Sequence, residues 1–156
     1  MENRTVRHAI LLTLSICSFF LISFRAGGFI QRRYTLEEVI NECSNIIFGT
    51  VTDVDQGRMT AKVRVEENLK GKSEFQEIKI NISTGQGNFP QKMIQKFEVG
   101  LPMIIFYKKG EPRILSLGHV HGTWFQTFAQ DQSDKSRVWW NFSHIEIHMH
   151  RTYNGT

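Results

Sequence analysis

Histidine is the residue type in this chain whose spacing comes closest to that of a chemical site. Five of the six histidines lie between residues 119 and 150. His119 and His121 are two residues apart and would share one face of a strand, whereas His144 and His148 are four apart and would share one face of a helix. Imidazole nitrogen is a common ligand of zinc and copper. These four histidines therefore form a metal-site hypothesis.

The metal hypothesis has a plainer alternative, in which the histidines are surface or packing residues. A tight site needs at least three fixed ligands, each oriented by a further residue. Glu146 is the nearby carboxylate and would be either a ligand or such an orienting partner. We expect the two pairs to approach each other, because a short polar loop after residue 129 favours an antiparallel return. We nevertheless favour the alternative and expect no cofactor; zinc or copper belongs to the metal hypothesis alone.

Aromatic residues are the second concentration of side chains able to bind something. They occupy the same C-terminal third of the chain as the histidines: Trp124, Phe125, Phe128, Trp139, Trp140 and Phe142. One interpretation is a second core that packs the C-terminal segment onto the rest of the fold. The other is an exposed aromatic face for a saccharide or peptide ligand, and its candidate residues are Trp124, Phe125, Trp139 and Trp140.

Motifs of catalytic nucleophiles do not occur in the sequence, which contains neither G-x-S-x-G nor H-E-x-x-H. We therefore lean against an enzyme. The formal net charge is +4, from 19 basic and 15 acidic residues, and three arginines and one glutamate of these lie in residues 1–28. The remainder is close to neutral, so charge gives no support for a nucleic-acid partner.

The N-terminal segment predicts export. Arg4 and Arg7 precede the uncharged stretch Ala9–Phe24, whose sixteen residues are fewer than the roughly 20 that a membrane span needs and match the core of a signal peptide. Small residues at 26–28 provide a cleavage site before Phe29. The alternative is an uncleaved N-terminal anchor, which is the one contact with a membrane that we expect. Cleavage would leave Cys43 as the single cysteine and so exclude an internal disulfide.

The stretch 45–71 predicts two antiparallel strands joined by a tight turn. In its second half, Met59, Ala61, Val63 and Val65 alternate with polar residues, which is the period of a strand with one buried face. We expect Gly57 to supply the positive φ of the turn. Gly49 lies inside the first strand, where glycine marks a bend or a close backbone approach.

Further elements are expected on both sides of this hairpin. Thr35 and Glu38 form a capping box for a helix with an apolar stripe of Leu36, Val39, Ile40 and Cys43. Later strands are expected around residues 78–82, 101–107, 114–117 and 120–129. Residues 143–153 fit either a helix capped by Ser143 and Glu146 or a strand, and we favour the helix because caps stand at both ends.

In this order of elements, the chain resembles the netrin-like and metalloproteinase-inhibitor-like modules of exported proteins. The resemblance covers about residues 35–118 and rests on the helix, on Ile46–Val51, on Val63–Val65 leading to Leu69-Lys70-Gly71, and on Met103–Tyr107 after Val99-Gly100. It implies an OB-type barrel of five strands and an extracytoplasmic setting. The inhibitors present an N-terminal, disulfide-bonded cysteine to the zinc of the protease, and this chain has no such cysteine, so their inhibitory function does not carry over.

These observations predict a mainly-β protein built on a small OB-like antiparallel barrel. We expect a signal peptide or anchor over 1–28, a linker over 29–34, the barrel over 35–129 and an extension over 130–156 packed on the barrel. The expected function is a non-catalytic binding or scaffolding module that is periplasmic, at the cell envelope or secreted, with a protein, peptide or saccharide partner. The alternative is a metal-binding protein or metal-dependent enzyme that uses the four histidines.

Overall fold

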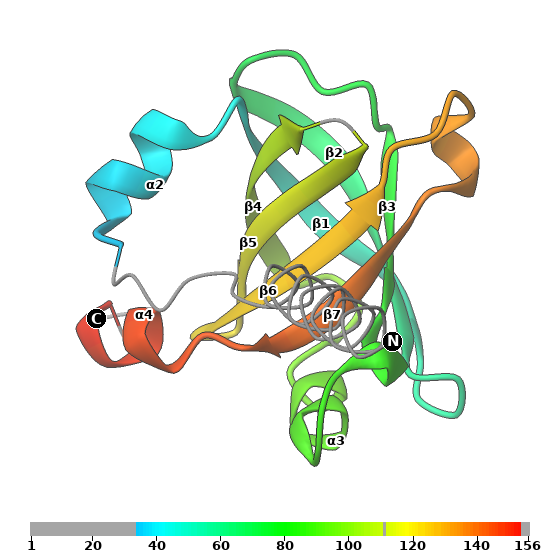
Figure 1. Ribbon diagram of the computed structural model, residues 1–156. Coiled ribbons are helices and arrows are strands. Elements are labelled where there is room, and N and C mark those ends of the chain that lie inside the picture. Colours follow the sequence, from blue (N-terminus) through cyan, green and yellow to red (C-terminus); the bar gives the residue numbers. More distant parts are fainter. Residues whose placement is uncertain (1–33, 111, 154–156) are drawn as a thin grey trace, which may run out of the picture. The chain divides into compact units, whose positions relative to one another are not determined.

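The computed structural model describes residues 34–110 and 112–153, and these form a closed β-barrel (Figure 1). The strands follow the order β1-β2-β3-β7-β6-β5-β4, and β4 closes the barrel by pairing with β1. All neighbours are antiparallel except β3 and β7, which run parallel. The predicted mainly-β small barrel is confirmed. Its strands are β1 Asn45–Asp55, β2 Thr60–Lys70, β3 Glu77–Asn81, β4 Pro102–Gly110, β5 Arg113–Val120, β6 Thr123–Gln130 and β7 Trp139–Ile145.

The barrel has seven strands, whereas the resemblance implies five, and it extends beyond residue 129. Strand β7 pairs with both β3 and β6, so the segment expected to lie on the barrel is part of its wall. The predicted signal peptide or anchor of residues 1–28 and most of the linker lie outside the described residues. Within the described part, no helix combines the length and the apolar character that crossing a membrane requires.

The hairpin of β1 and β2 is confirmed, with Val51 opposite Val63. Gly49 lies at a register shift, and a Cβ there would stand 2.4 Å from the carbonyl oxygen of Arg64, so the two backbones approach too closely for any side chain. The predicted turn geometry is wrong, because Met59 and not Gly57 has the positive φ, at 52°.

An acceptor in the turn explains the difference. Asp55 Oδ1 accepts a hydrogen bond from the Arg58 amide at 2.8 Å, which lets the aspartate shape the turn. The left-handed residue therefore comes at the end of the loop. Met59 packs against the core there, and its carbonyl accepts a bond from the Ile82 amide at 2.8 Å.

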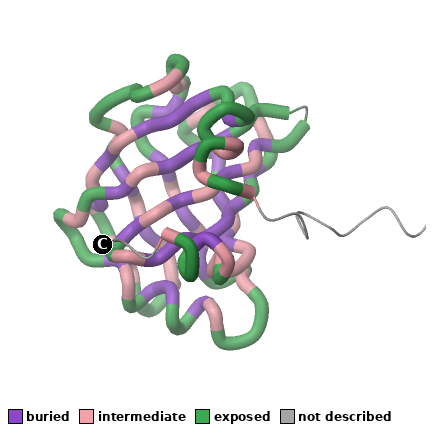
Figure 2. Tube along the Cα trace, turned by 90° about the vertical axis from the view of Figure 1, so that its left-hand side faces the viewer, coloured by how far each residue is buried: buried purple, intermediate pink, exposed green. Residues whose placement is uncertain are grey.

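Apolar side chains fill the barrel interior. Along the strands, buried residues alternate with less buried ones, as Figure 2 shows. Helix α3 (Phe89–Ile94) lies at one end of the barrel, where Met93 and Phe97 join the core. The connection between β2 and β3 brings Phe75 to the other end, and its ring packs at right angles to those of Tyr107 and Trp140.

Two short helices pack on the outside of the barrel. Helix α2 (Leu36–Glu42) begins at the predicted capping box, and its Leu36 and Val39 contact a second group of buried side chains on the outside of the barrel. This outer cluster consists of Cys43, Ile46, Phe106, Trp124 and Met149. Ile40 departs from the predicted stripe, since it is 39% exposed. Lys70 of β2 donates hydrogen bonds to the carbonyls of Ile40 and Asn41, at 2.6 and 3.3 Å, and so supplies the cation that favours a helix C-terminus.

The C-terminal segment combines both of its predicted structures. It is a strand through Ile145 and then a helix, α4 (Ile147–Thr152). The prediction that Ser143 caps the helix is wrong, because Glu146 is the N-cap and accepts a bond from the His148 amide at 3.1 Å. A strand already paired with β6 through Ile145 cannot turn helical at Ser143, so pairing with β6 decided where the helix begins.

Candidate functional site

The four predicted histidine ligands lie on different elements of the fold. His119 lies on β5, His121 in the following turn, His144 on β7 and His148 on α4. His144 and His148 therefore do not share a helix face. Among the described residues, no group of three or more histidine, cysteine, aspartate or glutamate side chains is arranged to hold a metal ion. The four side chains are therefore not arranged as one metal site, and the metal hypothesis gains no support.

Glu146 has a structural position at the start of α4. Its Oε2 accepts a hydrogen bond from Gln126 Nε2 at 2.7 Å and lies 3.6 Å from His144 Nε2. Its amide donates to the Trp124 carbonyl at 2.8 Å. Glu146 therefore does lie beside a histidine, as predicted. Its contacts attach the start of α4 to β6 and β7 and do not orient a metal ligand.

The four aromatic ligand candidates separate into three environments. Phe125 and Trp140 point into the barrel and are 1% exposed, so they belong to the core. Trp124 lies outside the barrel but is covered, at 5% exposure, in the outer cluster with Phe106 and Met149. Trp139 is 40% exposed. Of the four candidates, Trp139 alone presents its ring to solvent.

A second exposed ring stands on the strand next to Trp139. Phe128 on β6 is 43% exposed and lies opposite Asn141 of β7, which is two residues from Trp139 on the same outer face. Asn141 in turn lies opposite Asn81 of β3. The outer face of β3, β7 and β6 therefore carries two aromatic rings with two amide side chains between or beside them. We call Asn81, Phe128, Trp139 and Asn141 the aromatic–amide face.

Trp139 is held in place from the β3 side. Lys79 pairs with Trp139 across the two strands, and its ammonium nitrogen lies 5.8 Å from the centre of the indole. The same nitrogen donates a hydrogen bond to the Ser136 carbonyl, which fixes the position of the ammonium group over the ring. A cation over an indole face is favourable, and it leaves the remaining ring surface open.

Phe128, Asn81 and Asn141 were not among the predicted site residues. The alternation of inward and outward side chains along β7 is the sequence signal that could have identified Asn141. If Trp140 and Phe142 point inward, Trp139 and Asn141 must point outward, but this needs residues 139–145 to be identified as a strand. The indole nitrogen of Trp140, on the inner face of the same strand, is buried and has no hydrogen-bond partner among the described residues.

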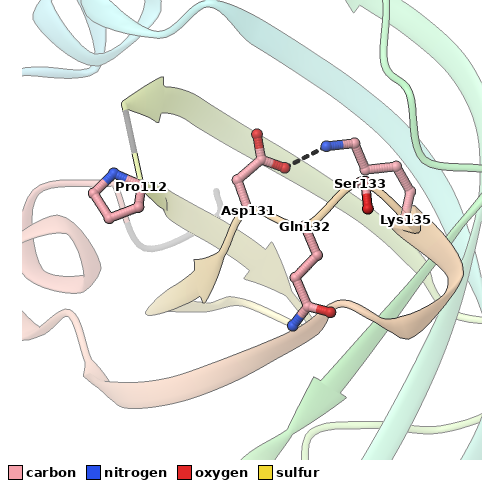
Figure 3. Close-up of a pocket in the computed structure, with 5 residues that line it drawn as sticks. All are labelled: Pro112, Asp131, Gln132, Ser133 and Lys135. Atoms are coloured by element: carbon pink, nitrogen blue, oxygen red, sulfur yellow. Dashed lines mark hydrogen bonds and ion pairs between the residues drawn. The ribbon is translucent and has the colours of Figure 1, made fainter.

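The end of the barrel beside Phe75 carries a hollow of about 380 Å³ (Figure 3). It is lined by Pro112, Asp131, Gln132, Ser133 and Lys135. Lys135 pairs with Asp131, and both belong to a network with Lys109 and Glu74. Lys109 lies 2.7 Å from Glu74.

The charges of this network balance within it. The hydrogen bond from Lys135 holds the pKa of Asp131 below its ordinary range, and that from Lys109 does the same for Glu74. Two cations and two anions satisfy one another, so the hollow offers no excess charge to an ionic ligand.

Comparison with protein-family models, with curated proteins and with solved structures finds no match for this chain.

Proposed function

We propose that this protein is an exported, non-catalytic β-barrel module that binds a saccharide on the aromatic–amide face. One observation carries the proposal: Phe128 and Trp139 expose about two-fifths of their surface on neighbouring strands, at 43% and 40%. Large rings left open together mark an interaction surface, since most of a monomer's aromatic residues are covered.

The chemistry of the face favours a saccharide over a charged ligand. An aromatic ring offers a flat apolar platform to the C–H face of a pyranose. An amide side chain has both a donor and an acceptor, which suits hydroxyl groups that also donate and accept. Asn141 adjoins both rings, since it lies opposite Phe128 and two residues from Trp139 on the same face of β7. The cation that lies over the Trp139 ring, Lys79, is already bonded to the Ser136 carbonyl.

The closed wall of the barrel also limits how a partner is bound. Peptides often bind by adding a strand to the free edge of a sheet. Here each of the seven strands is paired on both sides over at least part of its length. Little strand edge is left for such pairing, which favours binding through side chains on the wall by a ligand that lies flat on rings and amides.

Export is the part of the proposal that rests on the N-terminal sequence. A charged start followed by a short apolar stretch at 9–24 and small residues at 26–28 is typical of a signal peptide. Intact-mass measurement on exported protein tests it, with a mature chain expected to begin near Phe29. A mass that retains residues 1–28 would show an anchor in place of a cleaved signal.

Titration calorimetry of the full chain with soluble cello-, chito- and malto-oligosaccharides tests the ligand. We expect at least one series to bind, and Trp139→Ala to weaken it by about 30-fold, which corresponds to roughly 2 kcal/mol for a central aromatic residue. Leu69→Ala is the matched control. Leu69 is also apolar and exposed, at 50%, but it lies on β2 beyond the residues that pair with β3 and is not part of the aromatic–amide face.

Two results would overturn the saccharide assignment. One is the absence of binding to every series by the wild-type chain. The other is binding that Trp139→Ala and Phe128→Ala leave unchanged, which would place the saccharide elsewhere. Binding of a peptide in place of a saccharide at Trp139 would keep the face and replace the ligand class.

A further inference from the structure

His119 has an environment that differs from that of the other described histidines. It lies on the outer side of β5, opposite Trp124 of β6, and the two ring centres are 4.6 Å apart. Its Nε2 is buried and has no hydrogen-bond partner among the described residues. A buried ring nitrogen without a hydrogen-bond partner can remain neutral at modest cost. A charged ring there would lack both water and a partner.

A second histidine reaches the same place from α4. His150 Nδ1 lies 3.1 Å from the Gly122 carbonyl, and because a carbonyl only accepts, Nδ1 must carry the proton. This bond survives when His150 becomes an imidazolium, since both ring nitrogens then donate. Burial first, and repulsion from His150 second, lower the pKa of His119 below its ordinary value. The ring of His150 is therefore held at Gly122, beside a histidine that resists protonation.

Helix α4 is attached by few contacts, and several of them meet at Trp124. Trp124 Nε1 donates to the Tyr153 carbonyl at 2.9 Å, just after the helix, and Met149 packs on the same cluster. The Tyr153 hydroxyl then accepts a bond from the Leu36 amide at 3.1 Å, which joins α4 to α2. With six residues, α4 is too short to persist as a helix without these contacts.

We infer that His119, packed between Trp124 and His150, makes the docking of α4 on the barrel sensitive to mild acid, with the C-terminal half of α4 released from Trp124 when His119 is protonated. The sign follows from the two states of His119. Once α4 leaves, His119 gains access to water and loses the repulsion of His150, so the undocked chain binds a proton more readily. Docking is therefore weakened as the pH falls from the ordinary histidine value, near 6.5, towards the lower value of the docked state.

Other charged groups near α4 act mainly at its first turn. His144 Nε2 lies 3.6 Å from Glu146 Oε2, so the Glu146 end has a partner on β7 in addition to Gln126 of β6. His148 and Arg151 belong to α4 as well, and α2, which packs on the same cluster, carries three glutamates: Glu37, Glu38 and Glu42. Strand β6 contributes Trp124 and Gln126, which do not titrate in this range. Release is therefore expected to begin at Tyr153 and to leave the Glu146 end attached.

Amide hydrogen exchange on the full chain, read residue by residue by NMR at pH 7.5, 6.5 and 5.5, tests this inference. The reporters in α4 are the amides of His150 and Tyr153, which donate to Glu146 and Met149. The barrel reporter is the amide of Val51, which donates to Leu101. After correction for intrinsic exchange rates, we expect protection in α4 to fall roughly tenfold for each unit between the docked and free pKa of His119, while Val51 keeps its protection.

Variants separate the histidine pair from a general effect of acid. His119→Phe keeps a ring on Trp124 and should remove the pH dependence, whereas the control His121→Asn, an exposed residue with a φ of 46° that asparagine tolerates, should keep it. If His119→Phe does not fold, His150→Gln serves instead: without the repulsion of His150, the pKa of docked His119 lies closer to that of the free residue, so the loss of protection in acid should be smaller. Protection in wild-type α4 that does not change with pH, or an unchanged pH dependence in His119→Phe or His150→Gln, would overturn the inference.

Discussion

Two regions of the outer barrel wall each carry a tryptophan, which is covered in one region and exposed in the other. Trp124 of β6 and Trp139 of β7 both point away from the barrel interior. Trp124 is 5% exposed, because α4 and α2 pack over it, and its indole nitrogen has an acceptor in Tyr153. Trp139 is 40% exposed and has Lys79 on one side only.

Coverage by the helices, and not residue type or position in a strand, therefore decides which of these two aromatic residues is available to a ligand. The covered region has polar groups used for attachment: Gln126, Glu146 and His150 all bond within the molecule. The open region has Asn141 beside two exposed rings. Evolution towards stability and towards binding would act on these two regions separately, and substitutions can test whether they are in fact separate.

The largest contrast is expected between Trp124→Ala and Trp139→Ala. Removing the covered indole leaves a cavity under α4 and an unsatisfied Tyr153 carbonyl, which should destabilise the protein by about 3 kcal/mol. Removing the open indole loses mainly the contact with Lys79 and should cost less than about 1 kcal/mol. Urea unfolding measures both. Equal losses would mean that Trp139 is also a structural residue, and the comparison would fail.

A smaller contrast is expected within α4 itself. Met149 is 3% exposed and packs on Trp124, whereas Ile147, two residues earlier, is 48% exposed. Met149→Ala should destabilise the fold by roughly 2 kcal/mol, the low end for a buried methionine, because a short surface helix can adjust. Ile147→Ala should change stability by about 0.5 kcal/mol or less. Reversed magnitudes in thermal melts would indicate that α4 docks through its other face.

The sequence predicted those elements that local pattern determines. Alternation around Val63 and the T-x-x-E capping box each depend on a few neighbouring residues, and both are confirmed. The barrel class could also be predicted, since several short strands with few helical segments leave little else. The number of strands could not be predicted, because the parallel pairing of β3 with β7 joins segments far apart in the chain.

The candidate site was predicted only in part for the same reason. Trp139 and Trp140 are adjacent and chemically equal, yet one is open and one is in the core. Their difference depends on the register of β7 against β3, which no local pattern shows. The predicted helix face shared by His144 and His148 is wrong because residues 139–153 change from strand to helix at Glu146, and the spacing of the two histidines spans that change.

A third prediction concerns the link between the two helices that cover Trp124. Tyr153→Phe removes the hydroxyl that accepts the Leu36 amide bond, while the ring and its packing remain. Because the amide at the start of α2 can turn to water instead, the loss should be about 1 kcal/mol. Exchange of the Leu36 amide should quicken in this variant more than that of Val51. An unchanged exchange rate at Leu36 would show that the helices dock independently.

The smallest effect is expected at the end of the barrel where Glu74, Lys109, Asp131 and Lys135 form their network. Hydrogen bonds from the two lysines lower the pKa of Glu74 and of Asp131, so the folded state binds fewer protons than the unfolded state in acid. This contribution is present above the ordinary carboxyl range, near pH 4, and is lost as the pH falls through the lower folded values.

Glu74→Gln should therefore lower the melting temperature slightly at pH 7 and low salt, and the difference from wild type should vanish near pH 3 and shrink in 1 M salt. Glu67→Gln is the matched control, an exposed glutamate of β2 that should show neither dependence. The pH window separates this network from the histidine pair, whose effect falls around pH 6.5 and below. A loss of stability in Glu74→Gln that persists at pH 3 would mean that the side chain matters for the packing of Phe75 and not for its charge.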